Sequence, residues 1–391
     1  MTFALIFFWL SLGLLLLTYV FYAGITSLGA YVNREKQAST SSDFTPELTI
    51  LIAAYNEESY IREKIENTLA LDYPADKKKI IIVTDGSTDT TNEIILEYPS
   101  CQLLFKADRQ GKIAAVDRAM LQVKTSYTVF TDANTMLNKA ALLNLMRHFA
   151  DPKVGAVAGE KKVRSGKGAS AKGENLYWRY ESFLKEMDAN WHSVVGAAGE
   201  LYAIRTSLFE PVPTDTLLDD FMVTLSIAKK GYRVAYETEA YAIEDSSLNI
   251  QEEMKRKIRI CAGGFQSISR LGDLANPFKY GVLSIQYLIH RVFRWTVSPL
   301  ALALLILSSS YLALEGLFFY QFILLMQMAF YGVAILGKLL PNRKWPIPGF
   351  YVPYYFVVMH WCAYLGFWRY LNKQQSVNWA KAKRANIPKV G

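Results

Sequence analysis

The N-terminal segment carries no charged side chain before Arg34. This uncharged stretch is longer than the ~20 residues that a helix needs to cross the hydrocarbon core of a bilayer. A secretory signal peptide is the alternative, but it would begin with basic residues and have a short apolar core. We therefore predict an uncleaved transmembrane helix over residues 1–33. The Ser/Thr-rich residues that follow predict a linker over residues 34–46.

Three further uncharged stretches run from Trp295 to Leu314, from Gly316 to Gly337 and from Trp345 to Trp368. Buried core helices are the alternative, but three such stretches in succession favour a membrane. Residues 295–370 are therefore predicted to form two to three transmembrane helices. Irregular backbone is expected in the last stretch because of its prolines, which are Pro341, Pro346, Pro348 and Pro353.

Residues 251–294 precede these stretches and are predicted to lie at the membrane interface. Lys255 to Arg259 is a basic cluster, which reads either as a polybasic membrane-facing surface or as a phosphate clamp. Polar residues interrupt the apolar ones between Tyr280 and Arg294, namely Gln286, His290, Arg291 and Arg294. This pattern suits an amphipathic helix in the interface.

Basic residues also predict the orientation. Arg34 and Lys36 follow the first uncharged stretch and nothing basic precedes it, which places the middle of the chain in the cytosol of a multi-pass inner-membrane protein. Three late crossings would put the basic tail, residues 371–391, outside, whereas two would keep it inside. Nucleic acid is one partner for such a tail, but beside apolar segments the anionic membrane surface is favoured, so a membrane and no nucleic acid is expected.

Residues 47–250 alternate short β-branched runs with helical spacing. Strands are expected at 48–53, 79–83, 103–106 and 126–131, and helices at 57–71, 89–97 and 111–122. This alternation predicts an α/β domain with a mostly parallel sheet and flanking helices. Ligands of such sheets bind beyond the carboxyl ends of the strands. The polar residues that follow the strands are therefore candidate site residues.

Two loops follow the first two strands. Ala54, Tyr55, Asn56 and Glu57 come after the first, and residues 84–89 come after the second. Turn and helix-cap chemistry alone explains most of these residues. Asp85 is the exception, because capping by Ser87 or Asp89 does not need a second acid upstream.

Two later motifs suit an anion and a cation. Arg109 and Lys112 stand at the start of a predicted helix, where a diphosphate or only a solvated basic turn is expected. Asp132 and Asn134 follow an apolar strand and alternate, so they point the same way if the strand continues. Two oxygen ligands facing a diphosphate suit Mg²⁺ or Mn²⁺.

A pair of acids precedes another predicted helix, which runs from Met222 to Lys230. Asp219 and Asp220 are either N-terminal caps or include a general base for a hydroxyl. Burial would raise the pKa of such a base toward neutral pH.

Together these residues resemble the family 2 glycosyltransferases, which include cellulose, chitin and hyaluronan synthases. The resemblance runs from about Leu48 to Gln266 and rests on five motifs in the expected order and spacing. It implies a GT-A nucleotide-sugar-binding domain with N- and C-terminal transmembrane helices, an inverting mechanism and a divalent cation. A UDP-sugar is the expected donor, and a lipid-linked molecule or a glycan the expected acceptor.

The resemblance also implies roles for residues. Donor binding is assigned to Ala54, Tyr55, Asn56, Glu57, Asp85, Lys112 and Asp132, the metal to Asp132 and Asn134, the acceptor to Gly199, Glu200 and Arg256, and catalysis to Asp220, Asp219 and Arg259. Asp220 stands where the family has its base.

Two departures from the family pattern affect the expected product. Asn134 replaces an acid, so the metal would rest more on Asp132 and phosphate. Arg256 and Ile260 replace the Gln and Trp of the motif found in processive members, of which only Arg259 is kept. Transfer of one or a few sugars is therefore expected, with a processive synthase that exports its product as the alternative. Two alternative hypotheses do not involve glycosyl transfer: a nucleotide-sugar-binding protein without activity, and a transporter.

Overall fold

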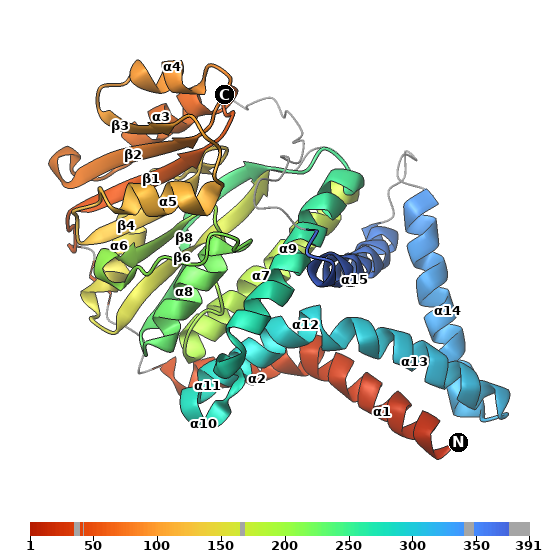
Figure 1. Ribbon diagram of the computed structural model, residues 1–391. Coiled ribbons are helices and arrows are strands. Elements are labelled where there is room, and N and C mark those ends of the chain that lie inside the picture. Colours follow the sequence, from red (N-terminus) through yellow and green to blue (C-terminus); the bar gives the residue numbers. More distant parts are fainter. Residues whose placement is uncertain (35–39, 42, 165–168, 340–347, 375–391) are drawn as a thin grey trace.

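The computed structural model describes all residues except 35–39, 42, 165–168, 340–347 and 375–391. It consists of an α/β domain joined to long apolar helices (Figure 1). Most of the predicted basic tail, part of the predicted linker, Pro341 and Pro346 lie outside the described residues.

The core of the α/β domain is an eight-stranded sheet with the order β3-β2-β1-β4-β7-β6-β8-β5. Its strands are β1 (Leu48–Ala54), β2 (Lys78–Asp85), β3 (Cys101–Lys106), β4 (Tyr127–Asp132), β5 (Met136–Leu137), β6 (Val154–Arg164), β7 (Tyr202–Arg205) and β8 (Arg233–Asp245). Strands β1 to β4 are parallel to one another, as predicted, but β7 is antiparallel to both neighbours. The sheet is therefore mixed. Helical crossovers connect β1 to β4, so each of these strands starts at the same edge of the sheet. Strand β7 follows a long helix, starts at the opposite edge and runs in the opposite direction.

Helices cover both faces of this sheet. They are α3 (Ile61–Leu69), α4 (Thr91–Leu96), α5 (Lys112–Met120), α6 (Ala141–Met146), α7 (Ala169–Trp191) and α8 (Asp219–Lys229), with short 3₁₀ turns η3 (Ala75–Lys77), η4 (Arg147–Ala150), η5 (Thr206–Leu208) and η6 (Gly272–Ala275). Successive side chains of one strand point to opposite faces of the sheet. Leu51 joins the cluster that includes α5 and α8, and Ile50 joins the cluster that includes α3 and α6. The central strands β1 and β4 are largely apolar, as expected for strands that are buried on both faces.

The remaining helices belong to the two ends of the chain. They are α1 (Thr2–Leu16), α2 (Tyr22–Val32), α9 (Ile250–Arg270), α10 (Pro277–Tyr280), α11 (Val282–Gln286), α12 (Phe293–Trp295), α13 (Val297–Leu314), α14 (Phe318–Leu339) and α15 (Pro348–Leu371), with π-helical turns η1 (Leu17–Phe21) and η7 (Tyr287–Val292). Helices α1 and α13 pack together, and α14 packs against both α13 and α15.

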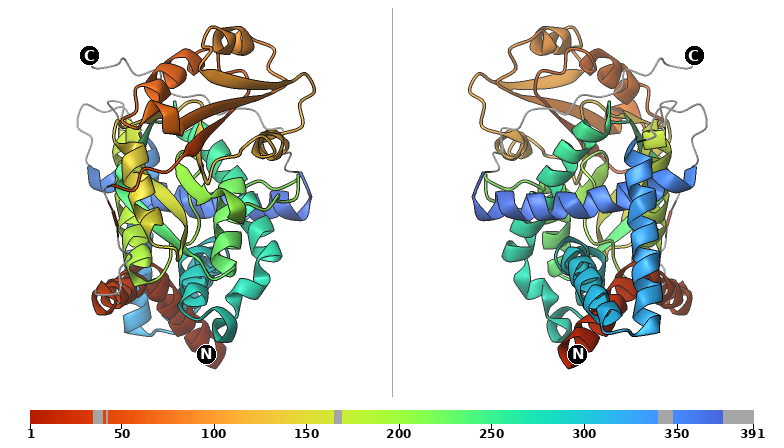
Figure 2. Two further views of the ribbon diagram at one scale, coloured as in Figure 1. Left: turned by 90° about the vertical axis from the view of Figure 1, so that its left-hand side faces the viewer. Right: turned by 90° about the vertical axis from the view of Figure 1, so that its right-hand side faces the viewer.

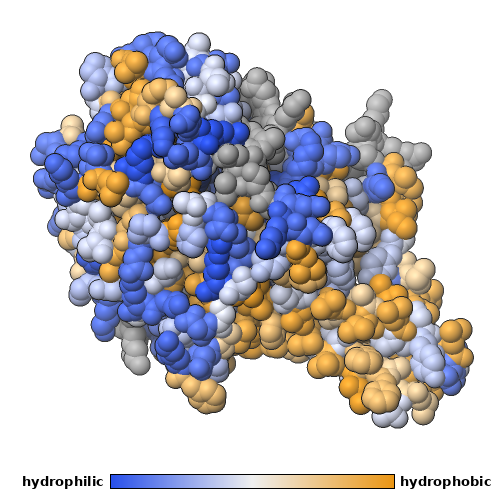
Figure 3. Space-filling model, in the orientation of Figure 1, coloured by the Kyte–Doolittle hydropathy of each residue, from blue (hydrophilic) through white to orange (hydrophobic). Residues whose placement is uncertain are grey.

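Three segments of the described chain are long and apolar enough to cross a membrane: Thr2–Val32, Val297–Leu314 and Phe318–Leu339. Hydrophobic residues gather on the surface over α1, α13 and α14 (Figure 3). Helix α15 is not among these segments. It packs along α9 and lies across the direction of α14 (Figure 2).

The structure bears on two sequence expectations about these helices. Helix α15 continues through Pro353, so irregular backbone is not found over the residues described there. The segment from Tyr280 to Arg294 does not turn its polar residues toward lipid headgroups. Gln286 and His290 are completely buried, and both contact Asp188 of α7. Hydrogen bonds inside the protein therefore explain the pattern that suggested an interfacial helix.

A substitution at Gly196 would test how tightly α8 packs on the loop before β7. Its φ of +87° favours glycine, and an added Cβ would collide with the Phe221 ring. We expect Gly196→Ala to lower the free energy of unfolding by about 2–4 kcal/mol, from backbone strain and overpacking. Gly231→Ala is the control. It has a φ of +90° but nothing within 4 Å, so strain alone should lower stability by about 1 kcal/mol. Equal unfolding midpoints for the two variants in detergent would contradict the packing.

Candidate active site

A cavity of ≈1020 Å³ lies between the carboxyl ends of the parallel strands and the helices of the chain ends. The predicted residues that line it are Ala54, Tyr55, Glu57, Asp85, Lys112, Asp132, Asn134, Gly199, Glu200, Asp219, Asp220, Arg256 and Arg259. Asn56 is the one predicted site residue that is not part of its lining. Folding thus brings together side chains from six different elements and their loops.

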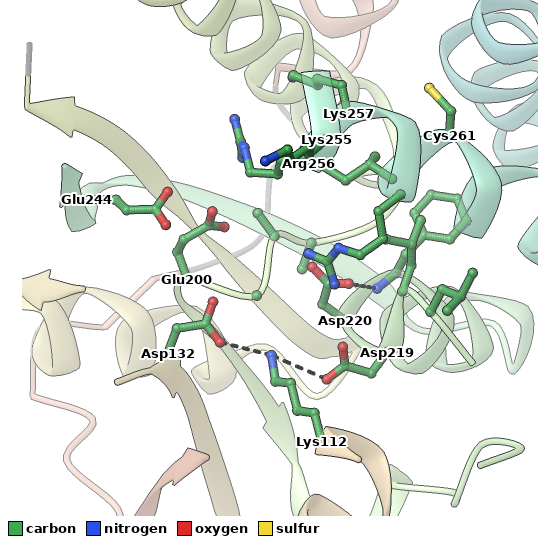
Figure 4. Close-up of a pocket in the computed structure, with 18 of the residues that line it drawn as sticks. Lys112, Asp132, Glu200, Asp219, Asp220, Glu244, Lys255, Arg256, Lys257 and Cys261 are labelled. Carbon is green, nitrogen blue, oxygen red and sulfur yellow. Dashed lines mark hydrogen bonds and ion pairs between the residues drawn. The ribbon is translucent and has the colours of Figure 1, made fainter. Parts of the chain in front are cut away.

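Lys112 lies between two carboxylates at the centre of this cavity (Figure 4). Its Nζ is 2.9 Å from Oδ1 of Asp132 and 3.6 Å from Oδ2 of Asp219. Lys112 is the first residue of α5, Asp132 the last of β4 and Asp219 the first of α8. Burial alone would lower the pKa of Lys112, but these carboxylates outweigh it and keep the pKa above its ordinary value. Lys112 is therefore a permanent cation within reach of an incoming anion.

Asp220 has the electrostatic setting of a proton acceptor at neutral pH. Burial and then the neighbouring Asp219 carboxylate raise its pKa to about 7. The Phe221 backbone N–H donates to its Oδ1 at 2.8 Å, which fixes the carboxylate at the start of α8. A carboxylate with this pKa can take a proton from a bound hydroxyl and release it to solvent.

Gly199 keeps a space open between these charges. A Cβ at this position would lie 3.4 Å from both Asp220 Oδ2 and Lys112 Nζ, and 3.6 Å from Asp132 Oδ2. A bound group can therefore approach the acids and the lysine together at this point.

Asp132 and Asn134 fit a sparsely coordinated divalent cation. Asp132 uses Oδ1 for Lys112, and its Oδ2 faces the space beside Gly199. The Asn134 amide nitrogen donates to Glu244 at 3.4 Å, which leaves the amide oxygen as its possible metal ligand. Strand β4 ends at Asp132 and does not continue to Asn134, so alternation along a strand does not apply to this pair, although both residues line the cavity. The described residues hold no cluster of three or more His, Cys, Asp or Glu for a metal, but Mg²⁺ and Mn²⁺ commonly use fewer protein ligands.

Asp85 shapes the loop that presents Lys112. Its carboxylate accepts backbone N–H groups from Gln110 at 3.0 Å and Gly111 at 2.6 Å. Asp85 is buried beneath the turn that begins α5. Its hydrogen bonds to this turn explain why an acid stands at this position, which capping by Ser87 or Asp89 did not explain. Its assignment to nucleoside binding stays a prediction.

The loop after β1 contributes an aromatic wall. The Arg109 guanidinium lies 3.7 Å from the centre of the Tyr55 ring. Asn56, with a φ of +52°, instead exchanges hydrogen bonds with Thr88 of the neighbouring loop. Asn56 therefore holds two loops together, and only its neighbours reach the cavity.

Residues 49–212 match the family model described as glycosyl transferase family 2. This segment is a family 2 glycosyltransferase domain. The predicted resemblance is thereby confirmed, and the fold is of the GT-A type.

Curated relatives of the family 2 domain are polymer synthases. The poly-β-1,6-N-acetyl-D-glucosamine synthase of Staphylococcus aureus (strain COL) is 28% identical over 264 residues, which cover 63% of each chain. The synthase of the same name from Staphylococcus epidermidis is 26% identical over 250 residues, 62% of this chain and 60% of that protein. The matched region thus spans less than two thirds of these relatives.

A solved structure shares the architecture over nearly the whole chain. The mannosyltransferase from Pyrobaculum calidifontis, in complex with GDP-Man and Mn²⁺, superimposes with a TM-score of 0.72. It covers 94% of this chain and 100% of its own, at 20% identity. This similarity concerns the fold, including the helices that flank the family 2 domain.

Two of the predicted acceptor residues, Glu200 and Arg256, are held by ion pairs. Glu200 pairs with Lys161, whose Nζ is also 2.5 Å from Oε2 of Glu244. Burial would raise the pKa of Glu200, but Lys161 outweighs it and keeps the pKa far below its ordinary value. Arg256 pairs with Glu253 through Nη2–Oε1 at 2.8 Å.

Lys161 does not line the cavity, but it holds two residues that do, and the sequence did not indicate this role. Lys161 and Lys162 are adjacent on β6, and only the first is buried. The sequence offers no signal that separates them, because the buried face of β6 is set by pairing with β8. Glu244, the other partner of Lys161, also lines the cavity.

Proposed function

We propose that this chain is an inverting membrane glycosyltransferase that transfers a sugar from a nucleotide-sugar donor to a lipid-linked or glycan acceptor, in the synthesis of a cell-surface polysaccharide or glycolipid. The observation that carries the proposal is Asp220. It is a carboxylate with a pKa of about 7, close to the Lys112–Asp132 pair and inside the cavity of a family 2 domain.

The proposed reaction uses each group once. Asp220 accepts the proton of an acceptor hydroxyl, and the oxygen forms a bond to the anomeric carbon of the donor sugar. The bond from that carbon to the diphosphate breaks, and the nucleoside diphosphate leaves with its electron pair. Lys112 and Arg259 offset the charge that develops on this leaving group.

A divalent cation belongs to this proposal. Asp132 and Asn134 would hold Mg²⁺ or Mn²⁺, which would supply further charge compensation for the diphosphate. The mannosyltransferase with the same fold holds Mn²⁺ together with GDP-Man. We propose a UDP-sugar as donor here, because the curated relatives are named for an N-acetylglucosamine polymer.

The helices support a membrane topology with the active site in the cytosol. The first span would bring the chain in, and α13 and α14 would cross outward and back. Helix α15 would then remain on the catalytic side, since Arg369 near its end lines the same cavity as Asp220. This arrangement keeps the basic residues after α14 on the cytosolic side, in accordance with the positive-inside rule.

A processive synthase is the second candidate, and the names of the curated relatives favour it. Arg256 and Ile260, which replace the residues of the processive motif, both line the cavity. The two candidates differ in their products. A processive enzyme releases long chains even when acceptor is in large excess, whereas transfer of one or a few sugars gives short, discrete products.

The decisive test is donor turnover. Purified protein in detergent would be incubated with UDP- and GDP-sugars, Mg²⁺ or Mn²⁺ and a membrane lipid extract, and nucleoside diphosphate release would be measured. We expect release with one UDP-sugar, loss of release with chelator, and a product whose length decides between the two candidates. No release with any donor and acceptor would contradict the proposed function.

Gly199 provides a prediction that separates chemistry from folding. Gly199→Ala places its Cβ at ordinary van der Waals distances from Asp220, Lys112 and Asp132, and its backbone is not in the left-handed region. We therefore expect an unchanged unfolding midpoint but a fall of about 10- to 100-fold in kcat/KM, because the substrate is displaced from the reacting groups. Gly272→Ala, which has nothing within 4 Å, is the matched control and should retain full activity.

A further inference from the structure

Helix α3 carries a lysine where its amphipathic pattern favours an apolar side chain. The buried residues of α3 are Ile61, Lys64, Ile65 and Thr68, which recur at helical spacing. Lys64 has an exposed fraction of 0%, although lysine is almost never fully buried unless it is paired. In the described part of the chain, its ammonium binds neutral oxygens and forms no ion pair.

The Lys64 ammonium binds both ends of the turn that follows β4. We call Thr131–Thr135 the β4 turn; it contains the candidate metal ligands Asp132 and Asn134. Lys64 Nζ donates to the hydroxyl of the first residue of this turn and to the carbonyl of the last, each at 2.7 Å. One buried side chain thus spans the segment that presents both ligands.

A charge at this position costs free energy. Burial lowers the pKa of Lys64 to about 7, and the negative charge of Asp132 opposes that shift. A methionine or leucine would fill the same apolar stripe without burying an amine. The reason for a lysine at this place therefore lies in the turn that it binds and not in the packing of α3.

The β4 turn passes this contact on to the loop before β7. The Thr131 hydroxyl donates to the Glu200 carbonyl at 2.9 Å, and the Thr135 hydroxyl donates to the Asp132 carbonyl at 3.0 Å. Gly199 precedes Glu200, and a Cβ added to it would lie 3.6 Å from Asp132 Oδ2. These hydrogen bonds therefore fix where the Asp132 carboxylate stands relative to the Gly199 loop.

Helix α3 also holds the residues just beyond the β4 turn. The Asn67 side chain donates to the Leu137 carbonyl at 2.9 Å and accepts from the Leu137 N–H at 2.8 Å. Ala133, between the two candidate ligands, belongs to the apolar cluster that contains Ile61 of α3. The segment from the end of β4 to β5 is therefore bound to α3 along its length.

We propose that Lys64 is a positioning residue for the divalent cation, because it holds the β4 turn in the shape that presents Asp132 and Asn134 to the ion together. An amide oxygen carries no charge, so a site with one carboxylate and one amide depends strongly on how well both are oriented. Removing a group that orients a metal ligand commonly weakens metal binding about 10- to 100-fold. This inference rests on the cation of the proposed function, but binding tests it without turnover.

The experiment measures Mn²⁺ binding to the full chain in detergent, in the presence of UDP or GDP, from the electron paramagnetic resonance signal of free Mn²⁺. Lys64→Met keeps about the same side-chain length but removes the ammonium. We expect the affinity for Mn²⁺ to fall about 10- to 100-fold. Turnover should recover at high Mn²⁺ concentration, with a raised KM for the ion and a nearly unchanged kcat.

The direction of this change separates positioning from a simple effect of charge. Lys64 is a cation near Asp132, so the loss of its charge alone would strengthen the attraction for Mn²⁺. Tighter Mn²⁺ binding in Lys64→Met would therefore overturn the proposal. Unchanged binding would overturn it as well, because the lysine would then contribute to folding only.

Thr131 provides variants that leave the charge unchanged. Thr131→Val has nearly the same shape but lacks the hydroxyl that joins Lys64 to Glu200, and it should weaken Mn²⁺ binding in the same direction. Thr131→Ser keeps the hydroxyl and should retain the affinity of the parent protein. Equal affinities in these two variants would contradict a role of the hydrogen-bond network in holding the ion.

Lys78→Met is the matched control for a general loosening of α3. Lys78 Nζ donates to the carbonyls of Thr68, Leu69 and Leu71 at 3.2, 3.0 and 3.2 Å, which belong to the C-terminal end of α3 and not to the β4 turn. Its loss should leave Mn²⁺ affinity unchanged. A fall as large as that in Lys64→Met would overturn the proposal, since any disturbance of α3 would then have the same effect.

Failure of this inference is distinguishable from failure of the proposed function. A parent protein that binds no Mn²⁺ with either nucleotide would refute the cation and the role of Lys64 together. Normal turnover with equal Mn²⁺ affinity in the parent and in Lys64→Met would refute the role of Lys64 alone. Weakened Mn²⁺ binding in the variant of a protein that turns over no donor would support the role of Lys64 and refute the transferase.

Discussion

Asp220→Asn should reduce sugar transfer by about 10²- to 10⁴-fold while nucleotide affinity stays close to that of the parent protein. The magnitude is that of losing a positioned general base. The amide has the shape of the carboxylate, so the hydrogen bond from the Phe221 N–H and the start of α8 should persist. Initial rates at saturating donor, together with UDP titration, measure the two effects. Equal rates in both proteins would remove Asp220 from the mechanism.

The pH dependence tests the same residue in another way. A base must be ionised to act, so kcat/KM should rise with pH and level off above the pKa of Asp220, which is about 7. Asp219 contributes to this raised pKa by its charge. Asp219→Asn should therefore move the midpoint of the profile to lower pH. A midpoint that stays in place would contradict the electrostatic account of Asp220.

Glu181→Gln should cause the largest loss of stability, about 3–5 kcal/mol. Glu181 is 2% exposed and pairs with Arg291 at 2.7 Å and Arg294 at 2.8 Å, beside the buried His290. Removing one partner of a buried ion pair leaves the other charges without compensation. Because this network joins α7 to η7 and α12, the unfolding midpoint in detergent should fall strongly.

Glu97→Gln is the matched control for Glu181. Glu97 also binds an arginine, Arg62, but the two side chains are 53% and 48% exposed. Water screens such a pair, so the midpoint should stay essentially unchanged. Similar midpoints for Glu181→Gln and Glu97→Gln would show that burial of the network contributes nothing to stability.

The parallel half of the sheet was predictable because each strand is a short apolar run followed by polar residues. Strand β1 was expected to end at Ala53 and ends at Ala54, and β2, β3 and β4 lie within a few residues of their predicted positions. Strands β5 to β8 were not predicted. Their pairing joins residues far apart in the chain, such as Val129 with Ala203, and no local pattern encodes such a contact.

The same distinction between local and long-range features applies to the candidate site. Residues at strand ends and helix starts, such as Asp132, Lys112 and Asp220, were found because parallel strands bring those positions to one edge. The roles of Asp85 and Asn56 depended on hydrogen bonds between loops and could not be read from spacing. Lys161 was missed because a lysine is usually exposed to solvent, and only the fold reveals that this one is buried.

The length of the first helix has a consequence for where substrates enter. At about 1.5 Å per residue the 31 residues of Thr2–Val32 measure about 46 Å, whereas the hydrocarbon of a bilayer is about 30 Å thick. About ten residues are therefore left over, close to the extent of α2, and α2 is the part that packs against α7 through the hydrogen bond from Tyr22 to Asp188. Tyr19, which lines the cavity, then lies within about one helical turn of the end of the hydrocarbon. A molecule anchored in the leaflet on the side of the catalytic domain would meet this end of the cavity by lateral diffusion alone. Its concentration in two dimensions, not in the bulk, would set how often it arrives.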